Sequence, residues 1–335
     1  MKKRILAFLT IMVLALSSLF ACTPAEETNG ETGTKLVLNE VAHSIFYAPM
    51  YVAIEEGYFA EEGLDVTLVT GFGADKTMTA VLSGEADIGF MGSEASIYTY
   101  NEGATDYVVN FAQLTQRAGN FLVAREEMPD FKWEDLKGSY VLGGRKGGMP
   151  QMVFEYILKE NGINPATDLE INQSIDFGST AAAFTDSEAD YTVEFEPHAT
   201  SLEMEGKGYV VASLGEDSGY VPYTAFCAKQ SFIKGNKEAI QGFTNALQKG
   251  MDYVNSHTPK EIAKVIQPQF KETDLDTIVT IVSRYYEQDT WKSDLIFEKE
   301  SFELLQDILD SAGELEKRAP YKDLVTTEFA EKAAK

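Results

Sequence analysis

Cysteine and histidine are scarce in this chain of 335 residues. It contains two cysteines, Cys22 and Cys227, and three histidines, His43, His198 and His257. Two cysteines cannot form a disulfide framework or a cysteine-ligated metal cluster. The histidines lie far apart in the sequence and lack the spacing of a metal site. The sequence therefore predicts neither a metal centre nor a resident cofactor.

Basic residues are also few, since 28 Lys and Arg face 53 Asp and Glu, a formal net charge of −25. A surface this acidic repels phosphate backbones, which argues against general nucleic-acid binding. Hydrophobic residues make up 44% of the chain and charged residues 24%. This composition is typical of globular proteins and excludes global disorder, collagen and coiled coil. The length suffices for two domains, each with a sizeable core.

The first 21 residues have the layout of a bacterial export signal. A basic start, Lys2–Arg4, precedes an apolar run over residues 5–16. This run is shorter than the roughly 20 residues that a transmembrane helix needs. The segment Leu19-Phe20-Ala21-Cys22 resembles a bacterial lipobox, and the resemblance implies cleavage before Cys22 and diacylation of its thiol. An uncleaved N-terminal anchor is the alternative.

Residues 22–34 follow the signal as a polar stretch without periodicity, which predicts a flexible tether. Two acyl chains on Cys22 would meet the two-signal requirement for stable membrane anchoring. The sequence therefore predicts an exported protein, lipid-anchored to the outer face of the bacterial cell membrane. A lipidated Cys22 cannot pair with Cys227, which we expect to be a buried apolar residue.

Strand and helix patterns alternate from residue 35 onward. Runs rich in β-branched residues predict strands, and apolar residues recurring every three to four positions predict helices. The expected strands lie at 35–39, 64–70, 87–91, 108–114, 140–143, 169–173, 191–195, 209–213 and 221–227. The expected helices lie at 47–57, 76–82, 95–100, 150–161 and 181–184, and four more begin at Asn236, Thr258, Thr273 and Ser301. This alternation implies parallel sheets covered by helices on both faces.

The α/β pattern occurs twice and predicts a clamshell of two doubly wound lobes with C-terminal helices. Residues 35–115 and 224–335 are expected to form lobe one, and residues 116–223 lobe two. The chain would cross between the lobes near 112–118 and 220–226. Ligands of open α/β sheets bind beyond the carboxyl ends of the strands. Two facing lobes would therefore enclose a cleft that closes by hinge motion.

Three stretches of the body carry more specific patterns. They are residues 43–59 (HSIFYAPMYVAIEEGYF) with EGLDV at 62–66, residues 82–90 (LSGEADIGF) and residues 133–138 (WEDLKG). They resemble the sulfonate- and thiamine-precursor-binding (SsuA-like) family of extracytoplasmic solute-binding proteins. The resemblance covers about residues 35–320 and implies a type II periplasmic-binding-protein-like fold. It further implies a monomer without catalysis that delivers a small solute to the permease and ATPase of an ABC importer.

Candidate ligand-binding residues follow expected strands or precede expected helices, where backbone N–H groups are unpaired. They are His43, Ser44, Phe46, Gly73, Asp75, Ser93, Glu94, Gln116, Arg145, Gly147, Phe177, Ser179, Glu194, Phe195, Glu196 and Tyr223. Each type also has a structural interpretation. Glycines serve turns, acids cap helices, and aromatic residues belong to cores.

Aromatic and carboxylate side chains among these candidates favour a flat nitrogen heterocycle as the solute. Carboxylates accept hydrogen bonds from amino groups, and aromatic faces stack on planar rings. A thiamine-precursor pyrimidine fits this description. The serines, the helix N-termini and Arg145 leave a sulfonate, taurine or another small anion as the alternative.

Two other classes of function remain open. The family also includes a eukaryotic enzyme that synthesises the thiamine pyrimidine from its own histidine and a cofactor lysine. That chemistry would need His43 or His198 near Lys76 or Lys146 and an iron-associated cysteine cluster, whereas the body holds Cys227 alone. The other class is a ligand-sensing subunit that docks on a membrane receptor.

Overall fold

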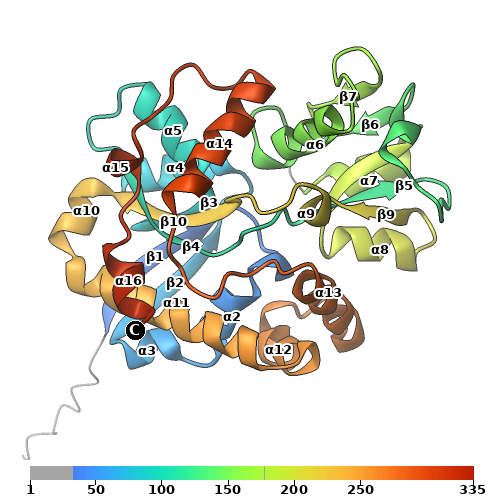
Figure 1. Ribbon diagram of the computed structural model, residues 1–335. Helices are drawn as coiled ribbons and strands as arrows, with labels where there is room; N and C mark the ends of the chain where they lie inside the picture. Colours follow the sequence, from blue (N-terminus) through green and yellow to red (C-terminus); the bar gives the residue numbers. More distant parts are fainter. Residues whose placement is uncertain (1–32, 177) are drawn as a thin grey trace, which may run out of the picture. The chain divides into compact units, whose positions relative to one another are not determined.

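The structure is a computed structural model that describes residues 33–176 and 178–335 (Figure 1). The predicted signal peptide, Cys22 and Phe177 lie outside these residues, as does the predicted tether up to residue 32. The described part contains two five-stranded sheets flanked by helices. None of its helices has the length and apolar character that crossing a bilayer requires.

Sheet one has the strand order β2-β1-β3-β10-β4. Its strands are β1 (Thr34–Glu40), β2 (Leu64–Thr70), β3 (Ile88–Gly92), β4 (Val108–Gln113) and β10 (Thr224–Lys229). Sheet two has the order β7-β6-β8-β5-β9. Its strands are β5 (Asn120–Ala124), β6 (Tyr140–Leu142), β7 (Glu170–Asn172), β8 (Tyr191–Phe195) and β9 (Tyr209–Ser213). The expected α/β class is thus confirmed.

The expectation of purely parallel sheets is wrong at one strand in each sheet. β10 runs antiparallel to β3 and β4, and β5 runs antiparallel to β8 and β9. These are the two strands through which the chain enters one sheet from the other. Thr224, the first residue of β10, pairs with Gly92, the last of β3, and Asn120 pairs likewise with Phe195. An entering strand starts where its neighbours end, so it must run in the opposite direction.

Helices follow most of the strands, as the alternation predicts. Those before β10 are α2 (Ala48–Glu55), α3 (Tyr58–Glu61), α4 (Ala74–Ser83), α5 (Glu94–Asn101), α6 (Met149–Glu160), α7 (Thr180–Asp186), α8 (His198–Met204) and α9 (Leu214–Asp217), with 3-10 turns η1 (Ile45–Tyr47) and η2 (Trp133–Leu136). Those after β10 are α10 (Gln230–Gly235), α11 (Lys237–Ser256), α12 (Pro259–Ile266), α13 (Leu275–Glu287), α14 (Lys299–Ala312), α15 (Tyr321–Leu324) and α16 (Glu328–Ala333), with η3 (Gln267–Gln269).

The C-terminal helices contact both sheets' helical layers. α11 packs on α2, where a Cβ on Gly250 would lie 2.2 Å from the carbonyl oxygen of Pro49, so only glycine permits this approach. α14 packs instead on α6 of the other layer, as Figure 1 shows. The two long helices α11 and α14 therefore pack on the helices of different sheets.

Helix ends agree with the sequence signals in several places. Thr258 and Glu261 form the expected capping box of α12, and Gly313 ends α14 in the left-handed conformation. Asn236 occupies the N-cap of α11, but its side chain donates to the carbonyl of Phe232 and does not cap. The helices expected from Thr273 and Ser301 begin instead at Leu275 and Lys299.

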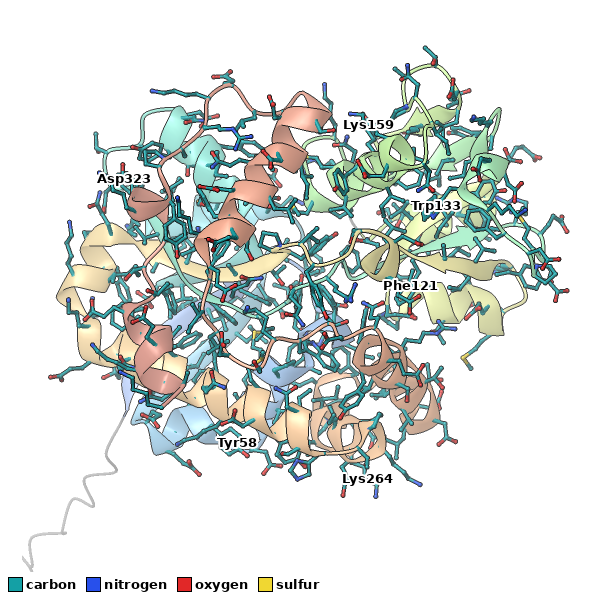
Figure 2. The ribbon with its side chains drawn as sticks, viewed as in Figure 1. Tyr58, Phe121, Trp133, Lys159, Lys264 and Asp323 are labelled. Atoms are coloured by element: carbon teal, nitrogen blue, oxygen red, sulfur yellow. The ribbon has the colours of Figure 1, made fainter. Side chains whose placement is uncertain are left out.

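An aromatic cluster lies in the core, where side chains fill the space between the ribbons (Figure 2). The Phe90 and Phe226 rings of neighbouring strands stack with centroids 4.1 Å apart. Phe46 is fully buried, and its ring contacts Tyr223 at 5.7 Å and Tyr285 at 5.2 Å. Cys227 is buried in sheet one, as expected, and burial raises the pKa of its thiol to about 12.

Candidate functional site

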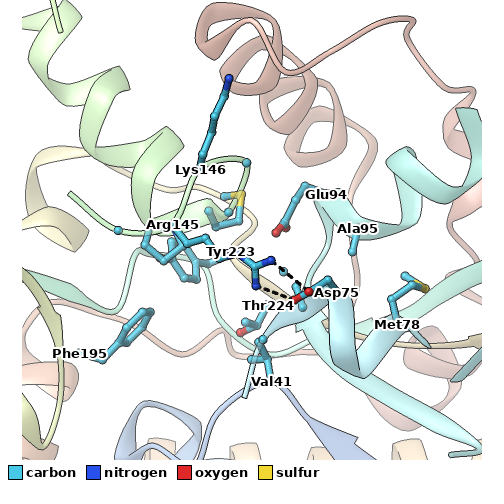
Figure 3. A pocket seen from close by; sticks show the side chains of 18 of the residues that line it. Val41, Asp75, Met78, Glu94, Ala95, Arg145, Lys146, Phe195, Tyr223 and Thr224 are labelled. Carbon is cyan, nitrogen blue, oxygen red and sulfur yellow. Dashed lines mark hydrogen bonds and ion pairs between the residues drawn. The ribbon is translucent and has the colours of Figure 1, made fainter. Parts of the chain in front are cut away.

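A cavity of about 500 Å³, the main cavity, lies where the two sheets face each other (Figure 3). Sheet one contributes Val41 after β1 and Gly92 at the end of β3, and sheet two contributes Glu194 and Phe195 at the end of β8. These positions are the carboxyl ends of parallel strands, where open α/β sheets bind ligands. The volume lies within the roughly 300–1,000 Å³ typical of small-molecule sites.

The main cavity brings together half of the residues that sequence reasoning selected. They are Gly73, Asp75, Glu94, Arg145, Gly147, Glu194, Phe195 and Tyr223. Glu196, Ser44 and His43 line a second cavity of about 250 Å³, which shares Phe195 and His198 with the first.

The remaining selected residues that the structure describes lie outside both linings. Phe46 is a core residue. The Ser93 hydroxyl donates to the carbonyl of Pro222, and the Gln116 amide donates to the carbonyl of Asp289. Ser179 stands at the N-cap of α7, between cavity-lining neighbours.

Sequence reasoning missed several residues that line the main cavity, including Tyr98, Asn120 and His198. Tyr98 lies one helical turn after Glu94, so helical spacing could have found it. Asn120 begins β5, whose sequence NFLVA lacks the alternation of apolar and polar residues that identifies a strand. His198 was considered only as a metal ligand and as a histidine of the enzyme alternative, not as a contact of the solute.

Glu94 is the first residue of α5, and its carboxyl points into the main cavity (Figure 3). The residue is only 2% exposed. Burial raises the pKa of this carboxyl to about 8, although backbone N–H groups of Glu94 and Met149 favour the anion. Oε2 is buried and has no hydrogen-bond partner in the described part of the chain. Burial therefore favours the protonated form of Glu94.

Glu194, near the end of β8, is a second buried carboxyl of the main cavity. Its Oε2 accepts a hydrogen bond from the Thr180 hydroxyl at 2.8 Å, and its Oε1 accepts from Thr192 at 2.7 Å. Burial raises the pKa of Glu194 to about 7, while the two hydroxyl donors act against this rise. Both carboxyl oxygens are thus held in fixed positions.

An ion pair joins the two sides of the cleft at the rim of the main cavity (Figure 3). Arg145, in the loop before α6, donates to both carboxylate oxygens of Asp75 in α4, at 3.0 and 3.2 Å. Both side chains are about half exposed, so solvent screens the attraction to at most about 1 kcal/mol. Lys146 pairs with Glu314 at 3.7 Å. The basic residues of the lining are therefore paired at the rim, whereas its buried ionisable groups include two acids.

Tyrosines fix the inner wall of the main cavity. The Tyr223 hydroxyl donates to Oδ1 of Asn120, and its ring lies 6.2 Å from that of Phe195. On the opposite wall, the Tyr98 hydroxyl donates across the cleft to the carbonyl of Gly147 at 3.1 Å. The wall thus offers aromatic surface that is already held in place by hydrogen bonds.

The carboxylate of Glu196 is fully engaged by protein groups. Its Oε1 accepts hydrogen bonds from Arg284 at 2.8 Å and from the Thr200 hydroxyl at 2.9 Å, and its Oε2 accepts from the Thr200 N–H at 2.9 Å. This arrangement gives Glu196 a structural role, so we do not retain it among the residues proposed to contact the solute.

His43 is also engaged, outside the main cavity. Its Nδ1 lies 2.8 Å from Oε1 of Glu40, and its Nε2 lies 2.9 Å from the carbonyl oxygen of Gln269. Burial opposes a positive charge on the ring, but both hydrogen bonds favour it and raise the pKa of His43 overall. In the described part of the chain, no three His, Cys, Asp or Glu side chains are grouped to hold a metal ion.

Two mixed sheets with a cavity between them define the periplasmic-binding-protein fold, as expected from the sequence. Residues 45–262 match the family model described as NMT1/THI5 like, and the chain belongs to this family. YtlA, a provisionally named binding protein of Bacillus subtilis (strain 168), is 50% identical over 302 residues, covering 90% of each chain.

Solved structures show the same fold at low sequence identity. The alkanesulfonate-binding protein SsuA of Xanthomonas axonopodis pv. citri, bound to MOPS, has a TM-score of 0.72 at 14% identity, covering 88% of this chain and 98% of its own. The nitrate-binding protein NrtA of Synechocystis PCC 6803 has a TM-score of 0.69 at 16% identity, covering 90% and 88%. The resemblance to the SsuA-like proteins is thus confirmed for the fold.

Proposed function

We propose that this protein is the extracytoplasmic substrate-binding protein of an ABC-type importer. The observation that carries the proposal is the main cavity, which is formed by both lobes at the carboxyl ends of their strands. Such a cavity surrounds a small solute and releases it when the lobes move apart. The names of SsuA, NrtA and YtlA support a binding role. A permease and its ATPase would then be the partners.

The enzyme alternative receives less support, although His198 and Lys146, two of its candidate residues, both line the main cavity. His43 lies outside the main cavity, and its two ring nitrogens contact Glu40 and the Gln269 carbonyl. Cys227 is buried in sheet one rather than at the cleft. Binding and release require no bond to be made or broken.

Anchoring through Cys22 is part of the proposal, and it rests on the sequence alone. Cys22→Ser is expected to move the protein from the membrane fraction to the soluble fraction, because both acyl chains would be lost. Fractionation followed by immunoblotting measures this. Cys227→Ala is the matched control and should remain in the membrane fraction, since Cys227 lies in sheet one. Membrane retention of Cys22→Ser would contradict the lipoprotein interpretation.

We propose that the solute is a flat nitrogen heterocycle with amino groups, such as a thiamine-precursor pyrimidine. The main support is electrostatic, because Glu94 and Glu194 are buried in the lining while Arg145 is paired at the rim. Carboxyl oxygens accept hydrogen bonds from amino groups, and the aromatic wall offers faces for stacking. A sulfonate would approach the Glu194 carboxylate, while the basic side chains of the lining, Arg145 and Lys146, are paired with other acids, which disfavours the anion alternative.

Glu194→Gln is expected to weaken the binding of hydroxymethylpyrimidine about tenfold to a hundredfold, because it removes a charged hydrogen-bond acceptor. Titration calorimetry measures the dissociation constant. A thermal-shift screen comes first, since a solute at 100 times its dissociation constant adds about 2.7 kcal/mol to the free energy of unfolding. The control is Glu188→Gln, an exposed acid outside the lining. Preferential binding of arylsulfonates would contradict the proposed solute.

A further inference from the structure

Glu94 differs from Glu194, the other buried acid discussed for the main cavity, because one of its carboxyl oxygens has no hydrogen-bond partner among the described residues. Both oxygens of Glu194 accept hydrogen bonds from threonine hydroxyls, whereas Oε2 of Glu94 has no partner in the described part of the chain. An unsatisfied buried oxygen costs free energy. A protonated Oε2 would be a hydrogen-bond donor that lacks an acceptor, and a ring nitrogen of a heterocycle is such an acceptor.

We propose that Glu94 transfers its proton to a ring nitrogen of the bound heterocycle, so that the solute is held as a cation beside an ionised carboxylate. This inference rests on the proposed function and assigns the two acids different roles. Glu194 accepts a hydrogen bond from the amino group of the ring, and Glu94 supplies the proton.

Among the described residues, those around Glu94 supply no positive charge to the buried part of the main cavity. Burial raises the pKa values of Tyr47, Tyr98 and Tyr223 above the usual range, and the nearby Glu94 raises them further. The three hydroxyls therefore stay neutral. His198, also in the lining, has its pKa lowered by burial.

The two basic side chains of the lining, Arg145 and Lys146, have acidic partners. Arg145 is paired with Asp75 at the rim, and Lys146 is paired with Glu314. Glu194, an acid itself, lies on the lobe-two side of the cavity. A protonated ring would therefore provide the charge that stabilises ionised Glu94, and ionised Glu94 would in turn favour the protonated ring.

The proton transfer balances within the complex. The O–H bond at Oε2 of Glu94 breaks, and the ring nitrogen uses its lone pair to form an N–H bond. The pair changes from neutral acid and neutral base to carboxylate and cation, and no proton is exchanged with solvent when Glu94 is protonated before the solute binds. Backbone N–H groups of Glu94 and Met149 already favour the carboxylate that results.

The test is the ultraviolet difference spectrum of hydroxymethylpyrimidine bound to the wild-type protein at pH 8, where the free ring is neutral. Protonation of an aminopyrimidine changes its absorption, so the bound ring should show the spectrum that the free ring has in acid. Glu94→Gln should bind the ring in its neutral form and about tenfold to a hundredfold more weakly, because glutamine has no proton to transfer. Glu188→Gln should behave as the wild type does.

Each outcome decides one claim. A neutral-ring spectrum in the wild-type complex would overturn the proton transfer and leave the proposed function intact. Binding of an aniline analogue, which lacks ring nitrogens, as tightly as the pyrimidine would also overturn it. If no nitrogen base of the panel binds, the proposed solute class fails and this inference fails with it. The wild-type spectrum decides the matter even if Glu94→Gln does not fold.

Discussion

Arg284→Met is expected to lower the free energy of unfolding by about 3–5 kcal/mol, because it leaves a buried carboxylate without its cation. Arg284, in α13, donates to Glu196 at 2.8 Å and to Glu203 at 2.5 Å, and the Glu196 side chain is fully buried. These contacts join α13 to Glu196, which precedes α8, and to Glu203 within α8. Urea denaturation at pH 7, followed by far-ultraviolet circular dichroism, measures the loss.

A double-mutant cycle separates the ion pair from the general effect of the substitution. Glu196→Gln in the Arg284→Met background should recover most of the lost stability, because a neutral amide replaces the unpaired charge. The matched control is Lys299→Met, which breaks an exposed pair with Glu303 and should change stability by less than about 1 kcal/mol. A similarly small loss in Arg284→Met would show that water screens Glu196 despite its burial.

Glu94→Gln is expected to unfold at a higher temperature than the wild type at pH 8 and to differ much less at pH 5. The folded-state pKa of about 8 lies above the unfolded value of 4.5. The carboxyl therefore favours the folded state fully below pH 4.5, and this contribution is lost as the pH rises through 8. Compared with acidic pH, the free energy of unfolding at pH 7 is lower by on the order of 3 kcal/mol. The neutral amide avoids this cost.

Melting temperatures from pH 5 to pH 9 test this expectation. The control is Glu85→Gln, an exposed acid in the loop after α4, whose effect should be small at every pH. A difference between Glu94→Gln and wild type that does not grow with pH would mean that Glu94 ionises as readily in the folded chain as in the unfolded one. That result would also remove the proton on which the inferred transfer depends.

Local patterns were sufficient to locate most elements of this fold. The bounds of β2, β8 and β9 agree with the sequence, because alternation and β-branched residues describe a strand without reference to its neighbours. Strand β5 was not predicted, because its sequence NFLVA has no alternation of apolar and polar residues. The antiparallel direction of β5 and β10 was not predicted either, because it depends on the sheet from which the chain enters.

The residues of the candidate site were likewise predicted only in part. The rule that ligands bind beyond strand ends led to Glu94, Glu194, Asp75 and Arg145, and the structure places all four in one cavity lining. Glu196 follows Glu194 by two residues, and the same rule selected it. Its partner Arg284 is 88 residues away along the chain, so only the folded structure reveals the ion pair.

The strand order of sheet one has a consequence for how the chain folds as it is synthesised. β10 lies between β3 and β4, and β4 has hydrogen bonds to β10 alone among the strands of its sheet. The ribosome therefore completes all of sheet two, residues 120–213, before the strand that holds β4 in place exists. Sheet two comes from a continuous segment and can form early, whereas sheet one must keep an edge open until β10 arrives and inserts.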